Sequence, residues 1–307
     1  MRIDQLVSTA DSILKNQEDK TVKSIQASLD LAFNKLEEKT SKLYEKALED
    51  INTSSAFRLQ KLITELGALL ELIDPNKADF YRERLEKLIL LGQQTGLQLS
   101  SDIIKRFETD FGSLSIRVDI EAAAFAAQNG MERLSNHTSA FRQEAIQIIG
   151  YNLSIGSGAR KTASQLRAKF DLVKFKAEAI ARTETLAALN EAADRTYRDQ
   201  DVGYVQCFAT ADERTCKYCG YRNQRIYKRT DIKVPIHVMC RCKLTPIKPK
   251  WIETGLVDLE WSTKYHNEAG KEIIEKDSGV APFERSAGLT KPPASVWNPG
   301  EKPPKLK

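Results

Sequence analysis

Histidine is scarce in this 307-residue sequence, which holds only His137, His237 and His266. A hydrolytic metal site made of several neighbouring histidines cannot be assembled from such positions, and the helical zinc-protease pattern H-E-x-x-H is absent. The deaminase pattern, H-x-E with P-C-x-x-C, is absent too, because Met239 stands two residues after His237. These absences argue against an enzyme with a hydrolytic metal.

Long apolar runs are missing as well. No stretch of about 18 apolar residues occurs, so we expect no transmembrane helix. The chain starts Met1-Arg2-Ile3-Asp4-Gln5 and soon becomes highly charged, which predicts no apolar N-terminal targeting segment. Hydrophobic residues make up 41% of the sequence and charged residues 29%, a balance that suits a soluble protein rich in surface helix.

Proline and glycine are absent from residues 3–51. Apolar residues recur there in alternating steps of three and four, which predicts one or two long amphipathic helices packed on neighbouring helices or on another protein. The seam consists of Val22, Ile25, Leu29, Ala32, Leu36 and Leu43, with Lys39 interrupting it. Further helical stretches, at about 97–110, 117–134 and 138–150, make residues 1–150 a helical docking domain.

The next part of the chain has a mixed pattern. A Gly-Ser-Gly joint at 156–158 precedes two predicted helices, 161–170 and 172–198. Short strands are predicted at 204–209, 225–227 and 241–247. The fold class is therefore mainly α, with a small α+β zinc-stapled module after the long N-terminal helices.

Proline is concentrated at the other end of the chain, where seven of the ten prolines follow Lys248. Few apolar residues remain there to offset the entropy of ordering. Residues 248–307 are thus predicted to form an extended proline-rich C-terminal arm that packs through Trp251, Trp261 and Trp297 and has a flexible tip.

Cysteine occurs nowhere outside residues 207–242. A C-x-x-C pair is followed by H-x-x-C-x-C, and two tight turns that each present two ligands suit a tetrahedral Zn²⁺ site. The favoured ligands are Cys216, Cys219, His237 and Cys240, with Cys242 as the alternative fourth ligand. Cys207 is interpreted as a small buried apolar residue. With no second histidine near His237, the zinc is expected to be structural.

Three other interpretations of the cysteines compete with a zinc site: reduced cysteines that pack a core, a redox C-x-x-C pair, and structural disulfides. A redox C-x-x-C usually opens a helix after a strand, whereas the residues after Cys216 predict a turn. Structural disulfides between the pairs would require an oxidising compartment.

Positive charge is concentrated in the same part of the chain. Between Asp212 and Lys250 eleven Lys or Arg residues face three acidic residues, so this segment carries +8 and the remainder −3. Such a segment suits nucleic acid or an acidic protein partner, and a solvated face without a partner is the alternative. Arg225, Lys228 and Arg229 are the candidate DNA-binding residues.

Several motifs together resemble a known family. They are Ile180-Ala181-Arg182-Thr183-Glu184 with Ala188 and Asn190, then Asp212-x-Arg214-Thr215-Cys216-x-x-Cys219, and His237-x-x-Cys240-Arg241-Cys242. The combination is similar to the head-morphogenesis family, the Mu F-like minor head proteins of tailed bacteriophages, and covers about residues 156–247. The resemblance implies a non-enzymatic minor capsid protein of the virion, assembled in the host cytoplasm, with portal and capsid proteins as partners. It also implies contact with DNA during packaging or ejection.

The resemblance further implies a buried ionic network of Arg182, Glu184 and Asp212 that ties the helix to the metal loop. One departure from the family pattern lies after the C-x-x-C pair. The family usually has a turn glycine there, whereas this chain has Asn223-Gln224. We expect Asn223 to supply the left-handed backbone. Two other functions compete: a zinc-stabilised nucleic-acid-binding protein acting outside any virion, and a treble-clef metal nuclease.

Overall fold

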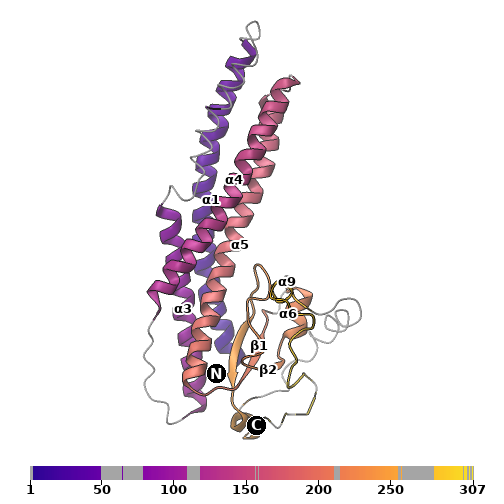
Figure 1. The fold of residues 1–307 in the computed structure, drawn as a ribbon. Coiled ribbons are helices and arrows are strands. Elements are labelled where there is room, and N and C mark those ends of the chain that lie inside the picture. The colour runs from indigo at the N-terminus through magenta and orange to yellow at the C-terminus, as the bar shows by residue number, and fades with distance from the viewer. Residues whose placement is uncertain are drawn as a thin grey trace. The chain divides into compact units, whose positions relative to one another are not determined.

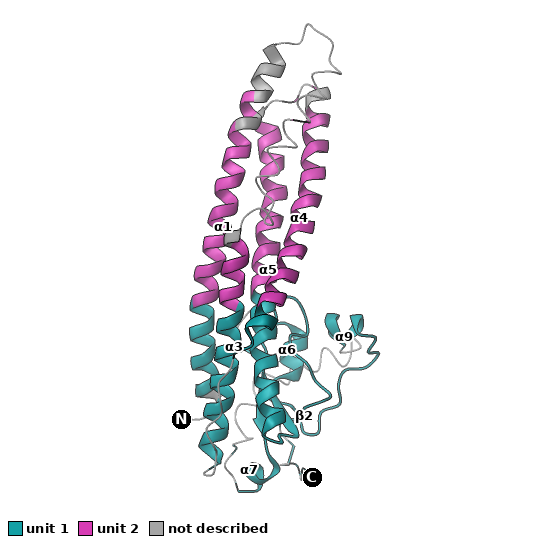
Figure 2. Cartoon of the chain, turned by 60° about the vertical axis from the view of Figure 1, so that its left-hand side comes forward, with its two compact units in different colours: residues 1–16, 89–123, 182–307 teal, residues 17–88, 124–181 magenta. Residues whose placement is uncertain are grey.

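The computed structural model describes residues 3–49, 64, 79–108, 118–155, 157, 159–210, 215–254, 257, 280–299, 301, 302, 304 and 306. The chain forms two compact units (Figure 2). Unit 1 comprises Met1–Asn16, Ile89–Ala123 and Arg182–Lys307, and unit 2 comprises Gln17–Leu88 and Ala124–Ala181. The sequence-based boundaries at 150, 156 and 248 stay predictions.

Four long helices dominate the described residues, as the predicted mainly α class requires (Figure 1). They are α1 (Ile3–Glu49), α3 (Asp79–Phe107), α4 (Ile120–Ser154) and α5 (Ala159–Asp199). The prediction of two helices at 161–170 and 172–198 was wrong: α5 is continuous, because Asp171 between them is neither glycine nor proline. None of the described helices is both long enough and apolar enough to span a bilayer.

Unit 2 has an apolar core that contains the predicted seam of α1. Val22, Ile25, Leu29 and Leu36 are buried, whereas the side chain of Leu43 lies outside the described residues. Phe33, which the predicted seam omits, is fully buried and stacks on Phe170 with ring centroids 4.4 Å apart. The sequence left open whether neighbouring helices or another protein cover this seam, and its described part is buried within the chain.

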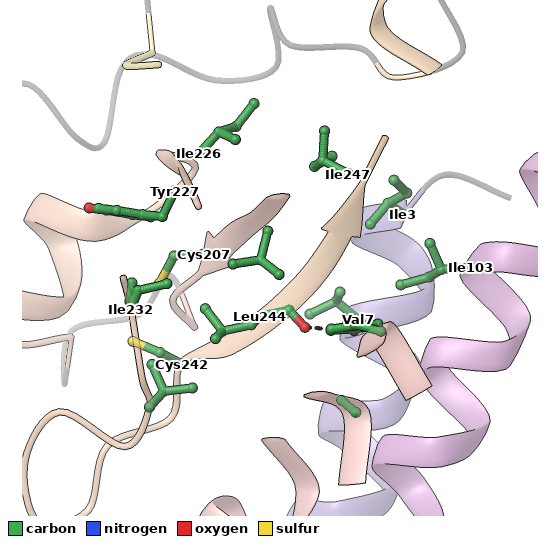
Figure 3. Packing of buried hydrophobic residues seen from close by; sticks show 14 of the residues in the cluster. Ile3, Val7, Ile103, Cys207, Ile226, Tyr227, Ile232, Cys242, Leu244 and Ile247 are labelled. Carbon is green, nitrogen blue, oxygen red and sulfur yellow. Dashed lines mark hydrogen bonds between the residues drawn. The ribbon is translucent and has the colours of Figure 1, made fainter. Parts of the chain in front are cut away.

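Unit 1 contains a three-stranded antiparallel sheet in the order β2-β1-β3. Its strands are β1 (Tyr204–Phe208), β2 (Ile226–Lys228) and β3 (Lys243–Ile247), which confirms all three predicted strands with slightly shifted ends. Cys207 of β1 lies opposite Leu244 of β3. The sheet packs on the first turns of α1 and the end of α3, where Ile3, Val7 and Ile103 belong to the same buried cluster as Leu244 and Ile247 (Figure 3).

Two glycines let α3 and α5 approach closely inside unit 1. A Cβ atom at Gly92 would lie 2.5 Å from the carbonyl oxygen of Thr185, and one at Gly96 would lie 2.1 Å from that of Leu189. No side chain larger than hydrogen fits such contacts without movement of the backbone. The pair therefore fixes the position of α5, the helix that carries the family motif.

The C-terminal part folds back onto unit 1 through two short helices, α7 (Pro249–Glu253) and α9 (Pro282–Ser286). Trp251 is fully buried and Trp297 is 2% exposed, which confirms that the arm packs through both. Trp251 lies against Phe107 of α3, with ring centroids 4.9 Å apart. Trp261 lies outside the described residues, and the flexible tip stays a prediction.

Candidate metal centre

The C-x-x-C pair lies at the start of a short helix, α6 (Lys217–Arg222). Cys216 is its N-cap, and the Cys216 sulfur accepts a hydrogen bond from the backbone N–H of Cys219 at 3.5 Å. The predicted turn was thus wrong, because a thiolate can satisfy a free N–H at a helix start. The C-x-x-C pair does open a helix after a strand, so its position in the fold does not argue against a redox motif. The side chains around the pair bear on the choice between a redox motif and a metal site.

Three further ligand-type side chains converge on this pair. His237 places its Nε2 atom 3.1 Å from the Cys216 sulfur and 3.0 Å from the Cys219 sulfur. The Cys219 and Cys240 sulfurs are 4.0 Å apart. Ligands that share one Zn²⁺ at about 2.3 Å lie roughly 3.8 Å apart in a tetrahedron. The Cys219–Cys240 spacing is close to that value, whereas the two shorter distances to His237 are those of hydrogen bonds.

The donor atoms form two overlapping groups. One group is Cys216, Cys219 and His237; the other is Cys219, Cys240 and Cys242; the ligand atoms of each lie within 4.8 Å of one another. A small cavity between them is lined by Cys216, Cys219, His237 and Cys242, but not by Cys240. The structure therefore brings together all of the predicted ligands and leaves two candidates for the fourth position, with the cavity favouring Cys242.

Proton affinities in the cluster fit a soft cation. Hydrogen bonds with Cys219 and, to a smaller extent, His237 outweigh the opposing effect of burial and lower the pKa of Cys216 to about 4. Burial alone would lower the pKa of His237, but the hydrogen bond with the Cys216 sulfur and the nearby thiolates raise it to about 9. A metal cation bound here would replace the protons that these side chains otherwise hold. Arg241 also lines the cavity, where its charge would offset excess thiolate charge.

Helix α5 holds the ligand loop, residues 237–242, and the start of β3 through a row of polar side chains seven residues apart. Thr183 Oγ1 accepts a hydrogen bond from the backbone N–H of Met239 at 3.0 Å. Asn190 Nδ2 donates to the carbonyl of Cys242 at 3.2 Å, and Asn190 Oδ1 accepts from the N–H of Leu244 at 3.1 Å. Tyr197 completes the row by donating to the Leu244 carbonyl at 2.8 Å. Seven-residue spacing keeps all three on one face of the helix.

The family resemblance implied that other residues, an ionic network, would connect α5 to the ligand loop. Arg182 and Glu184 are half-buried, and Asp212 lies outside the described residues, so their ionic network stays a prediction. The contacts that are seen come from Thr183 and Asn190, which belong to the same motif. Their seven-residue spacing, on a face that also carries Leu186, Ala187 and Ala193, was the signal available in the sequence.

The turn after the knuckle also differs from expectation. The left-handed backbone belongs to Gln224, at φ 61°, and not to Asn223, which is extended. Asn223 instead accepts a hydrogen bond at its Oδ1 from the N–H of Ala209 at 2.9 Å, which explains why its side chain is buried.

The three candidate DNA-binding residues differ in their surroundings. Arg225 stacks on the Tyr221 ring at 4.0 Å and bonds to Asn298. Arg229 pairs with Asp194 at 3.0 Å. Lys228 is exposed. Both arginines are thus held by contacts within the chain, and Lys228 is the residue best placed to meet a phosphate.

Comparison with known proteins agrees with the resemblance seen in the motifs. Residues 146–245 match the family model described as Phage Mu protein F like protein. No curated protein matches the chain, and no solved structure does. The matched segment includes all of α5, the three strands for nearly their full length, and every cysteine of the cluster. Over the segment that builds the candidate metal centre, this chain is similar to Mu F-like phage proteins.

Proposed function

We propose that the chain is a minor capsid protein of a tailed bacteriophage, a non-enzymatic component that acts beside the portal during head assembly. The observation that carries the proposal is the family match over residues 146–245, which coincides with the segment that α5 ties to the ligand loop. The family indicates a head-morphogenesis protein. The proposal adds two details to what the family indicates: a position at the portal, and contact with DNA during packaging or ejection.

The metal in this proposal is a structural Zn²⁺. Three thiolates and one imidazole are a common closed ligand set for this ion, and such a set leaves no position for a substrate or an activated water. Cys216, Cys219 and His237 supply three ligands, and Cys240 or Cys242 supplies the fourth. The ion would join α6 to the loop before β3, two elements otherwise too short to hold each other.

The competing functions receive less support from the site. A treble-clef nuclease needs a second catalytic histidine. Among the described residues of unit 1, His237 is the only histidine, and His266 lies outside them. A nucleic-acid-binding role outside a virion relies on Arg225, Lys228 and Arg229, and the two arginines among them are held by Asn298 and Asp194.

The test is the composition of assembled heads. Quantitative mass spectrometry of purified procapsids and mature heads should find this chain in fewer copies than the major shell protein, and cross-linking should connect it to the portal. Its absence from heads at every stage would contradict the proposal.

A deletion of residues 1–50 would not isolate the predicted docking role of the N-terminal helix. Ile3, Val7 and Ala10 are part of the core of unit 1, so that deletion would also damage the zinc module. Intact protein is therefore needed to establish the partner.

A further inference from the structure

Helix α6 is too short to be stable alone. It has six residues, and isolated helices of fewer than about 12 residues are marginal in water. Both of its ends are held from outside: Cys216 and Cys219 at the start belong to the candidate metal centre, and Arg222 at the end is completely buried. The order of α6 therefore depends on what binds each end.

The C-terminal segment binds the far end of α6. Arg222 Nη2 lies 2.5 Å from Glu284 Oε2, and the two side chains are 0% and 9% exposed. The same carboxylate oxygen accepts a hydrogen bond from the backbone N–H of Ala281 at 2.7 Å, which fixes it at the start of α9. A buried charge of this kind is strongly unfavourable once its partner leaves, so Arg222 requires α9 in place.

Helix α9 also contacts both of the segments that carry candidate ligands. The N–H of Phe283 donates to the carbonyl of Ile236 at 3.1 Å, next to His237 in the chain. Arg285 Nη2 donates to the hydroxyl of Tyr218 at 2.6 Å, and Tyr218 stands between the two cysteines of the C-x-x-C pair. α9 thus bridges the same two segments that a metal ion would join.

Further along, the C-terminal segment covers the free edge of the sheet. Trp297 accepts a hydrogen bond at its carbonyl from the N–H of Ile226 at 3.1 Å, and Val296 donates to the Ile226 carbonyl at 2.7 Å. Because β2 is an edge strand, these bonds cover backbone groups that are otherwise open to another strand. Whether this edge is covered depends on whether the segment stays docked.

We propose that the metal centre controls docking of the C-terminal segment, residues 280–299: a bound ion holds the segment on α6 and β2, and loss of the ion releases it. This rests on the metal site of the proposed function. An ion orders the start of α6 and fixes His237, which places Arg222 and Ile236 where α9 can reach both. The coupling is reciprocal by thermodynamic necessity, so a docked segment also raises the affinity for the metal.

The first arm of the test is hydrogen exchange of the full chain with and without Zn²⁺. Removal of the ion should speed exchange at least about tenfold at Phe283, Val296 and Ile226. Amides of the β1–β3 ladder should stay protected, because they belong to the apolar core shared with α1 and α3. Unchanged protection of the segment would overturn the proposal, and so would equal loss of protection throughout the sheet.

The second arm measures Zn²⁺ affinity by competition with a chelator. Glu284→Gln should weaken binding about 5- to 150-fold, the usual range for a coupling between two sites. Glu301→Gln is the matched control, because Glu301 bonds to Asn298 and none of its bonds reaches a ligand-bearing segment. Equal affinities for the Glu284 variant and wild type would overturn the coupling. Failure to bind any metal would overturn it too, while head composition tests the proposed function separately.

Discussion

The two compact units are stabilised by different kinds of contact. Unit 2 is held by apolar side chains, with Phe33, Phe141 and Phe170 at its centre, and its ion pairs, such as Arg167 with Glu37, are half-exposed. Unit 1 also has a large apolar core, but most of the buried polar residues among the described ones lie there. Apolar contacts tolerate changes in shape, whereas hydrogen bonds and metal ligands require one geometry. The unit that carries the family motif is therefore the more specifically defined one.

The largest expected effect follows from the metal centre of unit 1. Cys219 belongs to both ligand groups, so Cys219→Ser should abolish binding of Zn²⁺, which contributes roughly 10–16 kcal/mol in structural sites. Metal analysis of the purified protein should then fall from close to one equivalent to none. Helical content from unit 2 should persist in circular dichroism, since its core contains no ligand.

A pair of variants decides the fourth ligand. Because the cavity is lined by Cys242 and not by Cys240, Cys242→Ser should lose the metal while Cys240→Ser keeps it. Absorption of the Co²⁺-substituted protein reports the number of bound thiolates. The opposite result would restore the ligand set that the sequence favours.

Substitutions of Phe33 test whether unit 2 is stabilised mainly by apolar burial. Its ring is fully buried between Phe141 and Phe170, so Phe33→Ala should destabilise unit 2 by about 3–5 kcal/mol through lost burial and a cavity. Phe33→Leu should cost much less, because an apolar core repacks around a similar volume. Chemical denaturation followed by circular dichroism measures both. Comparable losses for the two variants would show that unit 2 depends on aromatic geometry rather than on burial.

Gly96 tests how strictly unit 1 is defined. Gly96→Ala should destabilise it by about 1–3 kcal/mol, because the added methyl would lie 2.1 Å from the Leu189 carbonyl. Gly150→Ala on α4 is the matched control: nothing lies within 4 Å of its Cβ position, so it should stabilise unit 2 by up to about 1 kcal/mol through helix propensity. Thermal unfolding measures both, and a neutral Gly96 variant would mean that α3 and α5 can separate without loss.

The sequence predicted the features with strong local signals. Helical periodicity identified α1, and cysteine spacing pointed to the side chains that the structure brings together, whose role as metal ligands stays a prediction. It failed where tertiary contacts decide. The pattern around Phe33 placed Ala32 in the seam, although Phe33 is the buried residue, because both positions fit steps of three or four. The role of Asn190 could not be read from its neighbours, since it depends on β3 lying beside α5.

The contact of Arg222 with Glu284 illustrates the same limit at long range. The two residues are separated by 62 positions, and nothing in the proline-rich composition of the arm predicts that one of its carboxylates is buried. Charge counting treated every arginine of the basic segment alike. The structure separates those held by intramolecular partners from those open to solvent.

That separation gives the smallest expected effect. If the basic segment contacts DNA, Lys228→Gln should lower the slope of log affinity against log salt by about 1, because one fewer phosphate counterion is released. Arg225→Gln should act differently: it removes the contact with Asn298 and should loosen the segment on β2 before it changes any DNA contact. Lys161→Gln, an exposed lysine of α5 in unit 2, is the control for general charge loss. Titration of labelled duplex DNA at several salt concentrations measures the slope, and equal slopes for wild type and the Lys228 variant would exclude this residue from the interface.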